Sequence, residues 1–240
     1  MLDAALRGDV GALRTSLSSE AAPDLLEARS PDGGWTALSL AAASGHAPCV
    51  RALLAAGADP NGADALGRTA LAWAATTGNA ECAAELLRAG ADVNRTDAGG
   101  LTPLLLAASH PAAARALVRA GAGTRARDAL GRTALMLATL VGATESVHTL
   151  LGADPECARL TDAAGVTALH LAAAGGHADI ARLLLGVGAD ALAPDAIGRA
   201  PIDNALRRAD TVTVCTFLEC SSRLAAEWTQ FAGLAIYNSM

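Results

Sequence analysis

The chain has 240 residues, of which 52% are hydrophobic but only 2% are aromatic, and its net charge at pH 7 is −6. Alanine supplies much of the apolar content, and the β-branched and aromatic residues that favour strands are scarce, so the composition favours an all-α fold over a sheet sandwich. The acidic balance argues against binding nucleic acid through phosphate contacts, and we expect no nucleic-acid partner.

The spacing of the cysteines and the lack of long apolar runs indicate in which cellular compartment the protein works. Five cysteines are spread along the chain without a C-x-x-C pair, which argues against a disulfide framework and a zinc site. We therefore expect a reducing compartment, the cytoplasm and/or the nucleus. The first ten residues, MLDAALRGDV, lack the apolar run of a signal peptide, and no stretch approaches 18 apolar residues, so we expect no membrane partner.

Residues 1–30 are predicted to form an N-terminal capping helix pair followed by a long connection. An apolar stripe with helical spacing runs through the first 17 residues, and Gly8 interrupts it. The stripe consists of Leu2, Leu6, Val10, Leu13 and Leu17.

From residue 31 onward a unit of about 33 residues recurs. The eight residues DALGRTAL occur twice, at 64–71 and at 128–135, and the near copy DAIGRAPI stands at 195–202. A glycine lies two residues before each marker position, and a leucine or isoleucine lies two residues after it. The markers are Thr36, Thr69, Thr102, Thr133 and Thr167, with Ala200 in the sixth copy.

Local physical chemistry explains this unit. Asp and Gly before the marker favour a turn, and the threonine hydroxyl can accept from a free N–H in the first turn of a helix. A short helix follows, as in TALAWAATTG (69–78), then a glycine, then a second helix that contains a leucine pair, as in AECAAELLRAG (80–90). One such helix pair cannot bury its own apolar face, so the units are predicted to stack into a solenoid.

Segments such as GVTALHLAAAGGHADIARLLLGVGAD (165–190) and GWTALSLAAASGHAPCVRALLAAGADPN (34–61) resemble ankyrin repeats, and the resemblance covers roughly residues 1–221. It implies an all-α ankyrin-repeat solenoid, in which each repeat has a β-hairpin finger and two antiparallel helices. Fingers and first helices would then form a concave face. The expected divisions are five repeats (31–63, 64–96, 97–127, 128–161 and 162–194), a C-terminal capping repeat (195–221) and an amphipathic tail helix (222–240).

The tail carries Leu224, Trp228, Phe231 and Ala235 at helical spacing. Three interpretations stay open: a helix that covers the end of the solenoid, a helix that docks on a partner, or the start of a further domain.

No known motif for phosphate binding, metal binding or nucleophilic catalysis occurs in the chain. His46 and His177 fall at the junction of the two helices, and His170 stands three residues after a capping threonine, so each has a structural explanation. Cys49 and Cys82 occupy the same repeat position and are expected to be buried, and Trp73 is expected to pack in the core. We therefore expect no catalytic residue, no cofactor and no metal, and a protein that is not an enzyme.

The resemblance implies a protein-interaction module (a scaffold, an adaptor or an inhibitor) that binds a protein or peptide with its finger residues and the ends of its first helices. Several arginines and no acid occur among these residues, so the expected partner is apolar with acidic residues, and the chain itself is expected to be a monomer. Equally open is that the arginines keep the fingertips soluble while the leucines pack between neighbouring hairpins. The candidate residues are Trp35, Leu66, Arg68, Leu101, Leu130, Arg132, Leu140, Val166, Ile197 and Arg199.

An alternative function concerns the basic residues. All 18 are arginine, which either reflects a GC-rich coding sequence or avoids lysine modification beside ubiquitin-transfer machinery. The second explanation would make the chain a substrate-recruiting part of a larger enzyme assembly such as a ubiquitin ligase.

Overall fold

The computed structural model describes residues 1–19, 22–31 and 33–220, so the tail helix expected at 222–240 lies outside the described residues. The chain divides into two compact units, residues 1–129 (unit 1) and residues 130–240 (unit 2). The helices of unit 1 are α1 (Leu2–Arg7), α2 (Val10–Leu17), α3 (Ala22–Leu26), α4 (Ala37–Ala43), α5 (Ala47–Ala55), α6 (Ala70–Thr77), α7 (Ala80–Arg88), α8 (Pro103–Leu106) and α9 (Pro111–Arg119). Those of unit 2 are α10 (Ala134–Leu140), α11 (Thr144–Ala153), the 3₁₀ helix η1 (Pro155–Arg159), α12 (Ala168–Gly175), α13 (Ala178–Gly186), α14 (Pro201–Arg208) and α15 (Thr211–Cys220).

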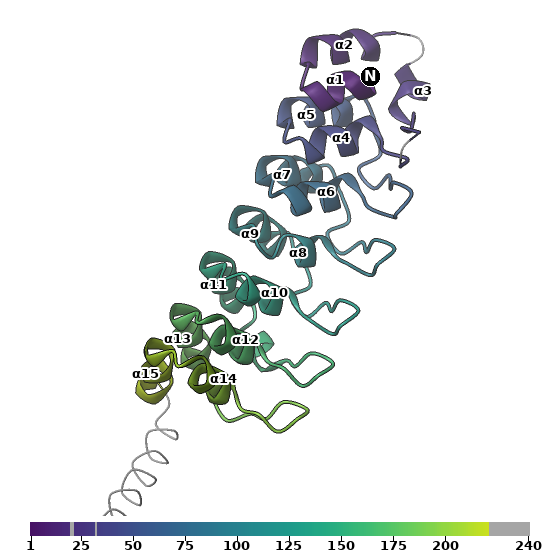
Figure 1. The fold of residues 1–240 in the computed structure, drawn as a ribbon. Coiled ribbons are helices and arrows are strands. Elements are labelled where there is room, and N and C mark those ends of the chain that lie inside the picture. Colours follow the sequence, from purple (N-terminus) through teal and green to yellow (C-terminus); the bar gives the residue numbers. More distant parts are fainter. Residues whose placement is uncertain (20–21, 32, 221–240) are drawn as a thin grey trace, which may run out of the picture. The chain divides into compact units, whose positions relative to one another are not determined.

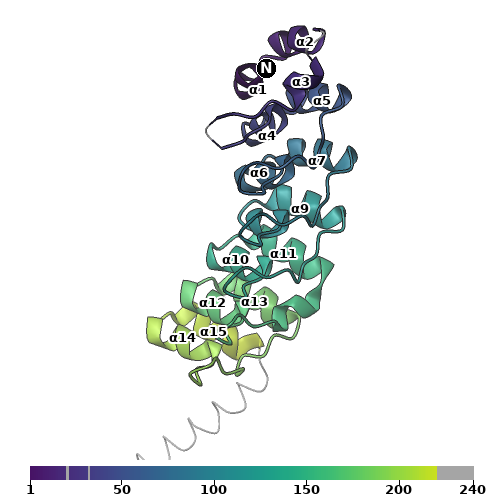
Figure 2. The same ribbon diagram turned by 90° about the vertical axis from the view of Figure 1, so that its right-hand side faces the viewer.

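Within each unit, helix pairs stack into two layers. The first helices of successive pairs lie side by side next to the projecting fingers, and the second helices form the other layer (Figures 1 and 2). In unit 1, α4 packs on α6 and α5 packs on α7; in unit 2, α12 packs on α14 and α13 packs on α15. The helix-rich solenoid expected from the repeat is confirmed.

The marker threonines begin the first helices as expected. Each hydroxyl accepts a hydrogen bond from the backbone N–H three residues later, which satisfies one of the free donors of the first turn. In the sixth copy the roles change: the Asp203 carboxylate accepts from the backbone N–H of Ala200 at 2.8 Å. The acceptors and donors are Thr36 and Ser39, Thr69 and Ala72, Thr102 and Leu105, Thr133 and Met136, and Thr167 and His170, at 3.1–3.4 Å.

In unit 1, the side chain of the residue just before each second helix contacts the preceding helix pair. A ring nitrogen of His46 lies 3.1 Å from the carbonyl oxygen of Leu6, and one of His110 lies 3.1 Å from that of Thr76. The amide of Asn79 donates to the carbonyls of Ala42 and Ala43 at 3.0 and 2.9 Å. These side chains therefore satisfy carbonyls at the end of the preceding first helix, which otherwise have no partner within the helix.

The core is built from alanine and leucine. Leu71, Leu86, Leu135 and Leu169 are fully buried, and alanines fill the spaces between helices. Phe217 in α15 is the largest of the fully buried side chains in the described residues. Cys49 and Cys82 are buried as expected, and burial is the main cause that raises the pKa of the Cys82 thiol to about 11. These thiols act as small apolar core residues.

Three local features of the structure go beyond what the sequence predicted. The fingers are turns rather than strands, and in the described residues only the isolated bridges Ala63–Thr69 and Thr161–Thr167 give them β character. The long connection after α2 contains the short helix α3. The repeat at 128–161 is one residue longer than the usual repeat, and the extra residue falls after its second helix. The 3₁₀ helix η1, which begins at Pro155, accommodates it.

Two buried hydroxyls in unit 2 make a testable prediction about stability. Thr139 and Ser146 are fully buried, and their hydroxyl oxygens have no hydrogen-bond partner among the described residues. Because an unsatisfied buried hydroxyl costs about 1–3 kcal/mol, we expect Thr139→Val to raise the free energy of unfolding by about 1 kcal/mol in urea titrations.

The matched control is Thr213→Val. Thr213 is equally buried, but its hydroxyl donates to Oδ2 of Asp210 at 2.7 Å, and this bond is the main cause that lowers the pKa of Asp210. The control should therefore lower stability by about 1 kcal/mol. A loss of stability in both variants would contradict the prediction.

Candidate binding surface

In four fingers an aspartate accepts two backbone hydrogen bonds from the turn that follows it. In the finger at 64–69, Oδ1 of Asp64 accepts from the N–H groups of Leu66 and Arg68 at 2.8 and 2.9 Å. Asp97, Asp162 and Asp195 make the same pair of bonds in their own fingers. The aspartate therefore replaces strand pairing as the local cause of the turn.

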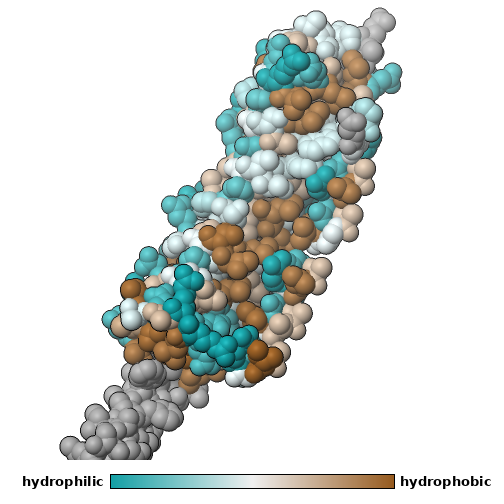
Figure 3. Space-filling model, in the orientation of Figure 1, coloured by the Kyte–Doolittle hydropathy of each residue, from teal (hydrophilic) through white to brown (hydrophobic). Residues whose placement is uncertain are grey.

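Neighbouring fingers within a unit are joined by single backbone hydrogen bonds. In unit 1, the N–H of Ala98 donates to the carbonyl of Leu66 at 2.9 Å; in unit 2, the N–H of Ala196 donates to that of Ala164 at 2.9 Å. We call the surface formed by the fingers and first helices of each unit its finger face. On the side drawn in Figure 3, apolar residues gather in several patches between hydrophilic ones.

The fingertips carry exposed apolar side chains. Leu66 is 54% exposed, Leu130 58% and Ile197 71%, and Leu140 and Val141 at the end of α10 are exposed as well. These exposures favour the binding interpretation at Leu66 and Leu130, and the alternative in which fingertip leucines pack between hairpins stays open. The candidates Trp35, Leu101, Arg132 and Val166 are half-buried at the bases of their fingers. All ten candidate residues stand on a finger or at a helix end, and their role in binding stays a prediction.

Two of the arginines are held by their own fingers. Nε of Arg68 donates to Oδ2 of Asp64 at 3.1 Å, and Arg199 makes the equivalent contact with Asp195. The backbone N–H of Arg199, that of Ile197 and the Arg199 side chain together lower the pKa of Asp195. The sequence-based prediction considered these arginines without the aspartates that pair with them. The spacing of four residues within one turn could have indicated this pairing.

Trp73 was expected in the core, and this expectation is wrong. The side chain is half-buried on the finger face and stacks on Trp35, with ring centroids 4.0 Å apart and planes inclined by 26°. Its indole N–H donates to Oδ2 of Asp64 at 3.0 Å. The reason is its place on α6, because neighbouring helices cover Leu71, Ala74 and Ala75 and leave position 73 toward the fingers.

The histidine assignments are supported where the structure tests them. Nδ1 of His170 accepts from the backbone N–H of Thr167 at 3.1 Å, and its Nε2 lies 3.0 Å from the carbonyl oxygen of Arg199. His170 thus joins its own helix start to the next finger. His46 and His177 precede α5 and α13 as expected.

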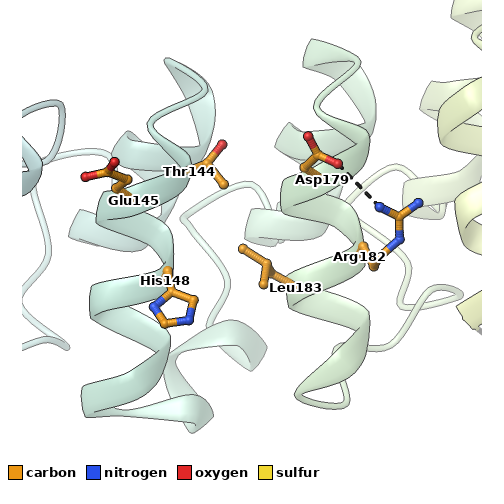
Figure 4. Close-up of a pocket in the computed structure, with 6 residues that line it drawn as sticks. All are labelled: Thr144, Glu145, His148, Asp179, Arg182 and Leu183. Carbon is orange, nitrogen blue, oxygen red and sulfur yellow. Dashed lines mark hydrogen bonds and ion pairs between the residues drawn. The ribbon is translucent and has the colours of Figure 1, made fainter.

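His148 lies in a shallow pocket of about 430 Å³ between α11 and α13. Figure 4 shows Leu183 pointing from α13 toward α11, whereas Glu145 points away from α13. Asp179 pairs with Arg182 at 3.3 Å. These groups do not converge on one point, and within the described residues no group of three or more His, Cys, Asp or Glu side chains could hold a metal ion.

Comparison with known proteins agrees with the architecture. Among the described helices, none is both long and apolar enough to cross a membrane. No curated protein matches the chain significantly. A family model described as ankyrin repeats (3 copies) matches residues 1–97 and 94–159, and one described as ankyrin repeats (many copies) matches residues 141–185. These matches cover well over half of the chain, and with the capped helix pairs and fingers they show that it belongs to the ankyrin-repeat family.

Proposed function

We propose that this chain is a non-enzymatic scaffold, adaptor or inhibitor that binds a protein or peptide across its finger faces. Ankyrin repeats are protein-interaction modules. The observation that carries the proposal is the exposure of apolar fingertips, Leu66 in unit 1 and Leu130 and Ile197 in unit 2. Exposed apolar residues that recur at one structural position mark an interaction surface, because a folded protein gains nothing from exposing them to water.

The partner proposed here is apolar with acidic residues, and the chain binds it as a monomer. Trp35 and Arg68 support this choice, because tryptophan and arginine are the residue types most often found at the energetic centres of interfaces. The five cysteines form no disulfide with one another, which favours a reducing compartment, the cytoplasm or the nucleus.

The test compares fingertip and off-finger variants of equal chemistry. We expect Leu66→Ser, Leu130→Ser and Ile197→Ser together to weaken binding of co-purified proteins at least tenfold, because each removes exposed apolar contact area. The control is Val212→Ser, which changes an exposed apolar residue in the second helix α15, outside the finger faces. Quantitative mass spectrometry of proteins retained from cell extract gives the measurement. Equal retention by the triple variant and by the control would refute the proposal.

A second candidate function rests on the all-arginine basic set. A substrate-recruiting part of a ubiquitin ligase would benefit from lacking lysine, because it would offer no side-chain acceptor for ubiquitin. The same retained proteins separate the two functions: ligase subunits bound to the control variant favour recruitment within an enzyme assembly.

A further inference from the structure

One cluster in unit 1 differs from every other finger. Trp73 occupies the position that Leu40, Leu106, Leu137 and Leu171 hold in their own first helices. Its ring stacks on Trp35 and also lies 3.8 Å from the guanidinium carbon of Arg68. Two aromatic rings and one cation thus meet at one point of the finger face of unit 1.

Arg68 is held in place before any partner arrives. Its backbone N–H and its Nε donate to Asp64, and its guanidinium lies over the Trp73 ring. Asp64 is buried and accepts four hydrogen bonds, the other two from Leu66 and the Trp73 indole. A side chain fixed in this way loses little conformational entropy on binding.

The Arg68 side chain is 25% exposed. The side-chain hydrogen bond described for it is made by Nε, so Nη1 and Nη2 can face a ligand. Two parallel Nη–H donors match the two oxygens of a carboxylate, and such charge-assisted pairs are among the stronger hydrogen bonds in proteins.

The same cluster disfavours other ligands. A cationic ligand would be repelled from the tryptophan faces, because the Arg68 guanidinium already lies over the Trp73 ring. A nucleic-acid backbone needs several basic residues along its path, whereas the chain has a net charge of −6.

We propose that Trp35, Arg68 and Trp73 form a carboxylate-binding anchor that takes an aspartate or glutamate side chain of the protein partner, with an adjacent apolar residue of that partner on Leu66. This inference rests on the proposed function, because it names the chemistry of the partner at one point of the finger face. Asp64 acts through Arg68 and positions it.

Arg88 supplies the charge control. It lies in the same unit but in the second helix α7, outside the finger face, and its side chain is exposed and pairs with Glu85. A general charge effect would appear in both arginines, whereas an anchor would appear only in Arg68.

The experiment uses a displayed library of random 12-residue peptides selected on the full chain. Enriched peptides are synthesised in pairs that differ by Glu→Gln or Asp→Asn, and their dissociation constants are measured by fluorescence polarisation. We expect acidic residues beside apolar ones in the enriched set, and at least tenfold weaker binding of the amide peptide. Arg68→Gln and Trp73→Leu should weaken binding of the acidic peptide about tenfold and remove its advantage over the amide peptide, while Arg88→Gln should change both dissociation constants less than twofold.

Trp73→Leu guards against a folding artefact, because leucine is the residue of four equivalent positions and the Asp64–Arg68 pair is kept; circular dichroism verifies the fold. Enriched peptides without acids, or an acid preference that survives Arg68→Gln, would overturn the anchor while leaving the proposed function standing. No enriched peptide, or peptides indifferent to the fingertip triple variant, would overturn both.

Discussion

Replacing Phe217 by alanine is expected to lower the free energy of unfolding of the last repeat by about 3–4 kcal/mol. Phe217 is fully buried in α15, which packs against α13 and α14. Removal of a large buried aromatic side chain loses its transfer free energy and leaves a cavity.

The loss should stay local, because each unit of a solenoid is stabilised mainly by its neighbours. Hydrogen exchange measured by mass spectrometry should show faster exchange in α14 and α15 of the variant, with α4–α7 unchanged. Val212→Ala provides the control, because Val212 lies in the same helix but is 64% exposed, and its exchange should match the unaltered protein. Uniform acceleration along the whole chain would contradict the prediction.

The repeated helix starts were predictable because their causes are local. A threonine hydroxyl three residues from the N–H that it accepts is visible in the sequence, and so is the glycine two residues before it. The buried cysteines were predictable for the same reason: α7 reads AECAAELLR, and the polar residues at positions 81, 85 and 88 leave one clear apolar face that contains Cys82.

Trp73 could not be placed in this way. α6 reads ALAWAATT, and a helix that is apolar or small at nearly every position does not indicate which side its neighbours cover. The stacking partner Trp35 lies one repeat away, so the contact depends on how the two repeats dock. The pairing of Arg68 with Asp64 is different, since both residues belong to one turn and their spacing alone suggests it.

The equivalent glycines Gly165 and Gly198 make a sharper test of how fingers support one another. Both have a positive φ, 74° and 79°, which costs any other residue about 1 kcal/mol or more. A methyl group on Gly165 would lie 2.9 Å from the backbone nitrogen of Ala196, whereas one on Gly198 would meet no described atom within 4 Å. We therefore expect Gly165→Ala to destabilise unit 2 by about 3 kcal/mol and Gly198→Ala by about 1 kcal/mol.

The difference between these two variants isolates the contact between fingers. The Gly165 methyl would push away the Ala196 N–H, which donates to the carbonyl of Ala164 at 2.9 Å, so the finger at 195–199 should lose protection from hydrogen exchange along with stability. Urea titrations of both variants measure the free energies, and exchange at Ala196 reports the bond. Equal losses in the two variants would mean that the fingers stand independently. A larger loss for Gly165→Ala would show that each finger helps to fix the position of the next fingertip. A partner that spans successive fingertips requires such fixed positions.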